Sequence, residues 1–241
     1  MLRLIMIVLK NLFRAPFFVK KMRRMGSNKE KYSEEIRYAY ARSALGGWIR
    51  KSGKIETLVY GKENLPKEGG YVMYPNHQGK YDVLGIVYAH ERPCTFVMDK
   101  AKSYTFIVRE IVDMIGAKRI ELHSVRNGLK VMNEITEEVK LGKRFILFSE
   151  GGYKKNKNHV QEFKPGSFKC AMNAKCPVVP VALIDSYKPF GNPGIGRVYT
   201  KVVFLPPINY EEYKGMKSVE LSNLVKERII EKMEEFGVDA R

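Results

Sequence analysis

Cysteine, histidine and tryptophan are scarce in this chain of 241 residues, which has three cysteines, four histidines and one tryptophan. Cys94, Cys170 and Cys176 form no CxxC pair and stand beside no histidine cluster. These spacings argue against a disulfide scaffold and against a zinc finger. We therefore expect a reducing compartment and no bound metal.

Acidic residues are also few, since 26 Asp and Glu face 43 Lys and Arg and leave a net charge of +17. Such a surplus attracts polyanions, whether nucleic acid, anionic lipid or acidic carrier proteins. Long Gly-, Ser- or Pro-rich stretches are missing and 44% of the residues are apolar, which favours an ordinary globular core. The sequence has no nucleic-acid recognition motif, phosphate loop or dinucleotide fingerprint, so we expect no nucleic-acid partner.

The first 26 residues hold seven Lys and Arg and no acidic residue. Their longest uncharged apolar run, Leu4–Leu9, is six residues long, whereas a spanning helix needs about 20. On a helical wheel an apolar face and a basic face separate: Leu2, Ile5, Met6, Leu9 and Phe13 against Arg3, Lys10 and Arg14. This pattern predicts a helix that lies flat among lipid headgroups and ends or kinks at Pro16.

Two other interpretations of this segment exist. The apolar face could pack on the protein's own core, as most apolar faces do. A secretory signal peptide fits less well, because Lys10 and Arg14 interrupt the apolar stretch and no small-residue cleavage site follows. We expect peripheral association with an anionic membrane surface, at the cytoplasmic face of the cell membrane.

In the rest of the chain, apolar segments typical of strands alternate with segments whose apolar residues recur at helical spacing. After a helix expected over Glu30–Lys51, strands are expected at Ile55–Tyr60, Tyr71–Tyr74, Thr95–Met98, Phe145–Phe148, Val178–Ile184 and Val198–Leu205. Helices are expected at Asp82–Ala89, Tyr104–Met114, Val125–Leu141, Ser167–Ala174 and Met216–Phe236. Because several strands are apolar throughout, we predict an α/β fold with a mostly parallel central sheet flanked by helices. Residues 1–53 would form an N-terminal, amphipathic two-helix segment that contacts the membrane, and residues 54–241 the α/β domain.

His77 and Asp82 follow the expected strand at Tyr71–Tyr74. Positions five apart on one helix face apart, so the two side chains meet only if the chain turns between them, which Pro75 and Gly79 favour. A carboxylate that holds one imidazole nitrogen leaves the other free to take a proton from a hydroxyl. Since no GxSxG motif provides a serine nucleophile, that hydroxyl would belong to the substrate. The alternative is a surface histidine beside an aspartate that caps a helix.

A second polar loop, Ser149–Lys155, follows the expected strand at Phe145–Phe148. It contains Glu150, then Gly151 and Gly152, then Lys154 and Lys155. A carboxylate, flexible backbone amides and ammonium groups suit an anionic or hydroxylated ligand. A simple Gly-Gly turn with solvated lysines would have the same residues.

Four blocks in this order carry a resemblance: Asn76-His77-x-x-x-x-Asp82, Gly116–Glu121, Phe148-Ser149-Glu150-Gly151 and Val179–Leu183. Together they resemble the glycerolipid acyltransferases of the lysophosphatidic acid acyltransferase type, over roughly residues 54–206. The resemblance implies that His77 deprotonates the free sn-2 hydroxyl of a 1-acyl-glycerol-3-phosphate while Asp82 orients the imidazole. The oxygen then attacks an acyl thioester directly, without a covalent acyl-enzyme, and phosphatidic acid results.

The resemblance also assigns the remaining parts of the site. Glu150 and Gly151 would bind the acceptor, Asn76 and Gly79 would shape the site, and Val179–Leu183 would be a buried supporting strand. The acyl donor would be acyl-CoA or an acyl-carrier protein, the acceptor a lysophospholipid, and no further cofactor is implied.

Two positions depart from the family pattern, because Leu122 and Tyr153 stand where the family usually has arginine. We expect Lys118 or Arg119, together with Lys154, Lys155 or Lys164, to bind the acceptor phosphate instead. If these residues are only solvated surface cations, the acceptor is another lysolipid. A catalytically silent, lipid-binding protein of the membrane surface is the further alternative.

Overall fold

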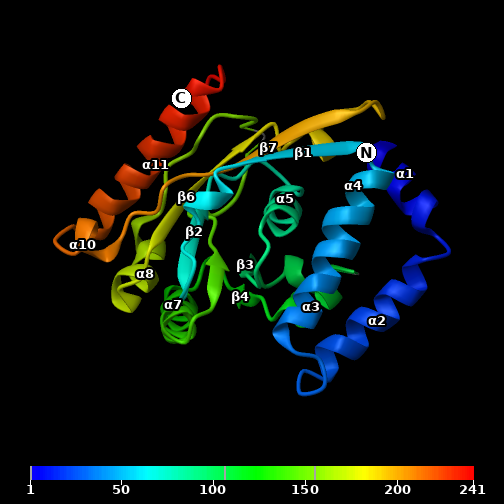
Figure 1. Ribbon diagram of the computed structural model, residues 1–241, viewed down its shortest axis with the longest axis horizontal. Helices are drawn as coiled ribbons and strands as arrows, with labels where there is room; N and C mark the ends of the chain where they lie inside the picture. The colour runs from blue at the N-terminus through cyan, green and yellow to red at the C-terminus, as the bar shows by residue number, and fades with distance from the viewer. Residues whose placement is uncertain (1, 106, 155) are drawn as a thin grey trace.

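The computed structural model describes residues 2–105, 107–154 and 156–241. Within that part of the chain, a seven-stranded sheet has the order β1-β7-β6-β2-β5-β3-β4 (Figure 1). The strands are β1 (Ile55–Tyr60), β2 (Tyr71–Pro75), β3 (Thr95–Asp99), β4 (Lys118–Ile120), β5 (Arg144–Ile146), β6 (Val178–Ile184) and β7 (Val198–Phe204). The sequence predicted all of these except the short, half-buried β4.

Five neighbouring strands, β6, β2, β5, β3 and β4, run parallel to one another. β7 is antiparallel to β6, and β1 pairs with β7 in parallel. The sheet is therefore mostly parallel, as predicted. In register, Met73 of β2 lies between Ile146 of β5 and Val179 of β6, so the loops that follow these three strands leave the same edge of the sheet.

Helices cover both faces of the sheet. On one face, α7 (Val125–Lys140), α8 (Lys169–Ala174) and α11 (Ser218–Glu235) pack on a hydrophobic cluster that includes Val72 and Tyr74. On the other face, α5 (Asp82–Ala89) and α6 (Val108–Ile115) pack on a cluster that includes Tyr71 and Met73 (Figure 1). Alternate residues of β2 thus serve opposite layers, as strand geometry requires. Two short helices, α9 (Lys188–Gly191) and α10 (Tyr210–Tyr213), lie in the connections around β7.

The N-terminal helices are α1 (Leu2–Asn11), α2 (Ala15–Ser27), α3 (Glu34–Ala41), the π-helical η1 (Arg42–Trp48) and α4 (Ile49–Ser52). The expected break falls at residues 12–14 rather than at Pro16, which stands in the first turn of α2. Proline is favoured there because its missing N–H would have no helical partner. α2 and α3 contribute Val19, Met22 and Tyr38 to the same cluster as the sheet. No helix in the described ranges combines the length and the apolar character that a membrane-spanning segment needs.

Arg3 corrects one expectation about α1. Its side chain is 1% exposed and donates to the carbonyl oxygens of Gly53, Gly194 and Gly196 at 2.7, 2.9 and 2.7 Å. Arg3 therefore does not belong to an outward basic face, because its guanidinium donates to three backbone carbonyls beyond its own helix. It attaches α1 to the protein.

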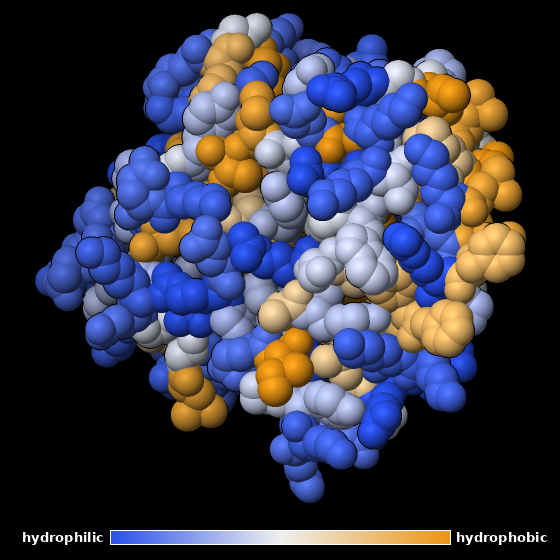
Figure 2. Space-filling model, turned by 45° about the vertical axis from the view of Figure 1, so that its right-hand side comes forward, coloured by the Kyte–Doolittle hydropathy of each residue, from blue (hydrophilic) through white to orange (hydrophobic). Residues whose placement is uncertain are grey.

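The apolar side of α1 faces outward. The exposed large apolar residues of this region are Leu2, Leu4, Ile5, Val8, Leu9, Leu12, Phe13 and Phe17. Figure 2 shows hydrophobic atoms gathered along the right-hand margin, over the side of the molecule that carries these helices. The apolar face of α1 therefore does not pack on the protein's own core, because the residues that α1 buries are Arg3 and Ile7.

Candidate active site

His77 and Asp82 meet at the carboxyl end of β2. His77 Nδ1 lies 2.7 Å from Asp82 Oδ2, although Asp82 begins α5. The loop between them folds over the carboxylate, because the N–H groups of Gln78 and Gly79 donate to the same oxygen at 2.6 and 2.9 Å. The turn around Gly79 therefore joins the two side chains and satisfies a carboxylate that is fully buried.

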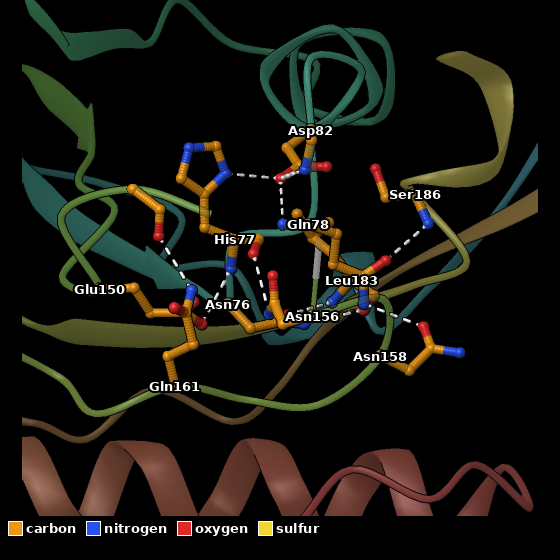
Figure 3. Close-up of polar contacts among 12 residues, drawn as sticks. Asn76, His77, Gln78, Asp82, Glu150, Asn156, Asn158, Gln161, Leu183 and Ser186 are labelled. Atoms are coloured by element: carbon orange, nitrogen blue, oxygen red, sulfur yellow. Dashed lines mark hydrogen bonds and ion pairs between the residues drawn. The ribbon is translucent and has the colours of Figure 1, made fainter. Parts of the chain in front are cut away.

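The imidazole of His77 is held between two aromatic rings. Its centroid lies 4.3 Å from that of Phe148 and 4.8 Å from that of Tyr153, whose plane is inclined by 76°. Because a carboxylate oxygen accepts, Nδ1 carries the proton and Nε2 keeps its lone pair. No hydrogen bond from the described residues occupies Nε2, and the side chain is 17% exposed. This nitrogen is available to a substrate hydroxyl (Figure 3).

Glu150 lies beside His77 because β2 and β5 are neighbouring strands, and the loops that follow them leave the same edge of the sheet. Its Oε1 accepts from the backbone N–H of His77 at 3.0 Å, and its Oε2 accepts from Gln161 Nε2 at 2.5 Å (Figure 3). The same Gln161 group donates to the carbonyl of Gly152 at 2.9 Å. Burial raises the pKa of the Glu150 carboxyl to about 7. Glu150 therefore fixes the backbone of His77 and can change its charge near neutral pH.

Asn76 ties this loop to β6. Its side chain donates to the carbonyl of Leu183 at 3.0 Å and accepts from the N–H of Leu183 at 2.7 Å. The block Val179–Leu183 is wholly buried in β6. It supports the loop because the backbone of Leu183 makes both hydrogen bonds to the side chain of Asn76.

Four polar residues beside the site were not predicted from the sequence: Gln78, Asn156, Asn158 and Gln161. Gln78 donates to Leu183 O and to Asn158 Oδ1 at 2.7 and 2.9 Å and accepts from the N–H of Ser186 at 2.8 Å. Asn156 donates to the carbonyl of His77 at 3.4 Å. These amides join three loops around the dyad, but their partners are far away in the chain, so spacing alone could not reveal them.

The expected phosphate ligands lie in different places. Lys118 is bound between Glu134 and Glu138 of α7 at 2.9 and 2.5 Å, and Arg119 pairs with Asp113 at 2.6 Å. Both belong to β4, which two strands separate from β2. The structure therefore does not bring these two residues to the dyad, and their charges are already paired.

Lys164 lies at the second polar loop. A Cβ added to Gly151 would clash with its Nζ, so the ammonium group covers the backbone next to Glu150. Gly151 has a φ of +72°, a conformation that favours glycine. Lys154 is exposed, and in the described ranges it forms no ion pair. Lys155 lies outside the described residues. Among those residues, no group of His, Cys, Asp and Glu side chains could hold a metal ion.

Comparisons with known proteins match the same segment. A family model described as Acyltransferase matches residues 56–184. The chain is 25% identical over 211 residues to a probable 1-acyl-sn-glycerol-3-phosphate acyltransferase of Mycoplasma genitalium, covering 81% of this chain and 76% of that protein. It is 26% identical over 192 residues to a 1-acyl-sn-glycerol-3-phosphate acyltransferase of Saccharomyces cerevisiae, covering 76% of this chain and 61% of that protein.

A crystal structure of the 1-acyl-sn-glycerophosphate acyltransferase from Thermotoga maritima has the same fold. Its TM-score with this chain is 0.75 at 20% identity, and the match covers 96% of this chain and 92% of that one. The matched family segment spans more than half of the sequence and contains both loops that form the site. The chain therefore belongs to the acyltransferase family, and it is an enzyme of that class.

Proposed function

We propose that this acyltransferase moves a fatty acyl group from a thioester to the free sn-2 hydroxyl of 1-acyl-glycerol-3-phosphate, which gives phosphatidic acid. The contact between His77 Nδ1 and the buried Asp82 carboxylate carries the proposal, because it leaves Nε2 as a base at an accessible edge. The names of the relatives support this acceptor over other alcohols.

The reaction follows from that geometry. His77 Nε2 takes the proton of the hydroxyl as its oxygen attacks the thioester carbonyl, and Asp82 stabilises the imidazolium that forms. When the tetrahedral adduct collapses, the carbon–sulfur bond breaks and the imidazolium returns the proton to the leaving thiolate. The products are an ester and a free thiol, and no residue of the enzyme is acylated.

The second loop would bind the acceptor. Glu150 and Gly151 lie directly beside His77 and would contact the glycerol, while Lys164 and Lys154 would make the surroundings basic. Lys118 and Arg119 could contribute only after leaving their carboxylate partners. The donor would be acyl-CoA or an acyl-carrier protein, both acidic and both attracted by a basic enzyme, and no further cofactor takes part.

The outward apolar face of α1, together with Leu12, Phe13 and Phe17 that follow it, supports a peripheral membrane enzyme. Exposed Leu, Ile, Val and Phe side chains lie there beside Lys10 and Arg14, which is the composition of a helix in an anionic headgroup layer. Residues 1–53 would form the membrane-contacting segment and residues 54–241 the acyltransferase domain. This arrangement would place the site at the cytoplasmic face, where acyl thioesters are available.

The decisive experiment is His77→Ala, with His123→Ala as the matched control because His123 is exposed and follows β4. Thiol release from acyl-CoA or acyl-carrier protein is measured with 1-acyl-glycerol-3-phosphate in vesicles. His77→Ala should lower the rate by about 100-fold or more, while circular dichroism and vesicle binding stay unchanged. A variant that keeps more than about a tenth of the wild-type rate would disprove general-base catalysis by His77.

A second candidate function rests on Leu122 and Tyr153, which replace the arginines usual in the family. It is acyl transfer to another lysolipid, or lipid binding without catalysis. Product analysis by mass spectrometry, with several lysolipid acceptors against both donor types, separates these cases. Conversion of a phosphodiester lysolipid in preference to 1-acyl-glycerol-3-phosphate would favour the other acceptor, and vesicle binding with no conversion at all would favour the silent protein.

A further inference from the structure

A hollow of about 320 Å³ opens beside the dyad. Gln78, Gly79 and Lys80 line it from the loop that joins His77 to Asp82, and Tyr153 and Lys157 line it from the loop after β5. The residues around α9 close the third side. Tyr153 is the shared wall, since its ring also contacts the imidazole of His77. A molecule in this hollow would therefore be separated from the imidazole of His77 by no more than the ring of Tyr153.

Two uncompensated cations face this space. Lys80 and Lys157 are exposed, and neither forms an ion pair with any residue that the structure describes. By contrast, Lys188 is paired with Asp185 at 2.7 Å and Lys100 with Glu121 at 2.6 Å. Because both side chains line the same hollow, a phosphate bound there could accept charge-assisted hydrogen bonds from each ammonium group.

The backbone on both sides of Lys157 is fixed to the dyad loop. Asn156 donates to the carbonyl of His77, and Asn158 Oδ1 accepts from Gln78 Nε2 at 2.9 Å and from the N–H of Asp185 at 2.9 Å. Lys80 follows Gly79, whose N–H is bound to the Asp82 carboxylate. Both lysines are thus attached to the elements that hold His77 and Asp82 together.

Covalent geometry decides which phosphate reaches this hollow. In 1-acyl-glycerol-3-phosphate the phosphate is on the carbon next to the one that carries the reacting hydroxyl. In acyl-CoA the whole pantetheine arm separates the thioester from the nearest phosphate. With the hydroxyl at His77 Nε2, the acceptor phosphate therefore stays within a few bonds of the dyad, whereas the donor phosphates lie a whole pantetheine arm away from it.

We propose that this hollow is the binding site for the acceptor phosphate, with Lys80 and Lys157 as its ligands in place of the arginines that positions 122 and 153 lack. This inference rests on the proposed function, because it assumes that the substrate hydroxyl lies at His77. It also predicts a preference for a terminal phosphate over a choline or ethanolamine phosphodiester, since a cationic headgroup would meet two further cations.

The test compares Lys80→Ala, Lys157→Ala and the double variant with Lys67→Ala. Lys67 is an exposed lysine in the loop before β2, at the opposite edge of the sheet, so it controls for the lost charge. Rates are measured in neutral mixed micelles with 1-acyl-glycerol-3-phosphate and with 1-acylglycerol, which lacks the phosphate. Glycerol 3-phosphate serves as a competitive inhibitor that reports binding of the headgroup alone.

Each single variant should raise the KM for 1-acyl-glycerol-3-phosphate about tenfold and the double variant about 100-fold, with kcat little changed. Inhibition by glycerol 3-phosphate should weaken in parallel, the rate with 1-acylglycerol should stay constant, and Lys157→Arg should restore most of the affinity. Lys67→Ala should behave as wild type.

Three results would overturn the inference. They are a KM change no larger than that of Lys67→Ala, an equal loss with both acceptors, and unaltered inhibition by glycerol 3-phosphate in the double variant. Each of these leaves the proposed function standing if wild type still converts 1-acyl-glycerol-3-phosphate. A wild-type enzyme that makes no phosphatidic acid would instead remove the proposed function and this inference together.

Discussion

Asp82 binds His77 through one carboxylate oxygen, Oδ2, while its other oxygen, Oδ1, is buried and has no hydrogen-bond partner among the described residues. Oδ2 accepts three hydrogen bonds, one from the imidazole and two from the N–H groups of Gln78 and Gly79. The same atom therefore orients the base and shapes the loop. These two roles can be separated by substitution.

Asp82→Asn should keep the loop and lose the charge. The amide oxygen can take the place of Oδ2 and accept the same three bonds, while its NH₂ occupies the position of Oδ1, where it finds no acceptor. Without a negative charge beside the imidazolium, kcat should fall by about 10² to 10⁴. Thiol release measures kcat, and thermal unfolding checks the fold.

Asp82→Ala serves as the comparison, because it removes both roles. It should lose activity and also lower the melting temperature more than Asp82→Asn does, since the N–H groups of Gln78 and Gly79 lose their acceptor. If Asp82→Asn kept more than a tenth of the wild-type kcat, charge stabilisation by Asp82 would not be part of the mechanism.

Glu150 should make folding depend on pH in an unusual direction. Its pKa is about 7 because of burial, above the ordinary value of 4.5, so the folded chain binds this proton more tightly than the unfolded chain. The stabilisation is fully present below pH 4.5 and is lost as the pH rises to about 7, at a slope of at most about 1.4 kcal/mol per pH unit. Glu150→Gln should remove this slope, which denaturant unfolding between pH 4.5 and 7.5 would detect. Parallel stability curves for the two proteins would show that Glu150 does not titrate in this range.

His90 should have the opposite effect. It is fully buried, donates from Nδ1 to the carbonyl of Arg92 at 2.6 Å and accepts at Nε2 from the Tyr71 hydroxyl at 2.7 Å. Burial, together with the charges of Arg144 and Arg92, lowers the pKa of His90 to about 4. The unfolded chain then binds the proton more readily, so stability should fall as the pH drops from about 6.5 to 4.

In His90→Asn the free energy of unfolding should decrease less as the pH falls. The substitution should also lower stability at neutral pH, because the hydrogen bond to the Tyr71 hydroxyl is lost. The measurement is the free energy of unfolding of His90→Asn and of wild type at several pH values between 4 and 7. Combining the substitution with Glu150→Gln isolates the histidine, because the two groups titrate over overlapping ranges with opposite signs. A wild-type slope that persists in His90→Asn would assign the acid sensitivity to another group.

Much of the fold could be predicted because local patterns determine it. The apolar runs at Val178–Ile184 and Ile55–Tyr60 and the helix Asp82–Ala89 have the same limits in the structure as in the sequence analysis. The sequence did not predict β4, because its residues, Lys118–Ile120, are few and mostly charged. They form a strand because they pair with β3.

The dyad could be predicted for a similar reason, since His77 and Asp82 are near each other in the chain. Partners far apart in sequence could not. Arg3 looks like part of a basic surface until the fold brings Gly194 and Gly196 beside it. Lys118 looks like a free phosphate ligand until α7 brings Glu134 and Glu138 to it. A charge in a sequence does not reveal which countercharge the tertiary structure supplies.

The exposed apolar residues of α1 and of the turn that follows it give a prediction that separates membrane binding from catalysis. Phe13 and Leu9 are 88% and 64% exposed, so their replacement by serine should leave folding unchanged. If these side chains enter the bilayer, each should lose about 1.5 to 3 kcal/mol of apolar burial, and vesicle binding should fall about tenfold or more for each substitution. Co-sedimentation with vesicles that contain anionic lipid measures this loss.

Val125→Ser is the matched control, because Val125 is 81% exposed but lies at the start of α7. It should bind vesicles as wild type does. With a water-soluble, short-chain acceptor, Phe13→Ser and Leu9→Ser should also retain the wild-type kcat, since no hydrogen bond among the described residues joins α1 to the dyad loops. Vesicle binding that falls equally in the control, or that survives the substitution of Leu9 and that of Phe13, would place the membrane contact on another surface of the enzyme.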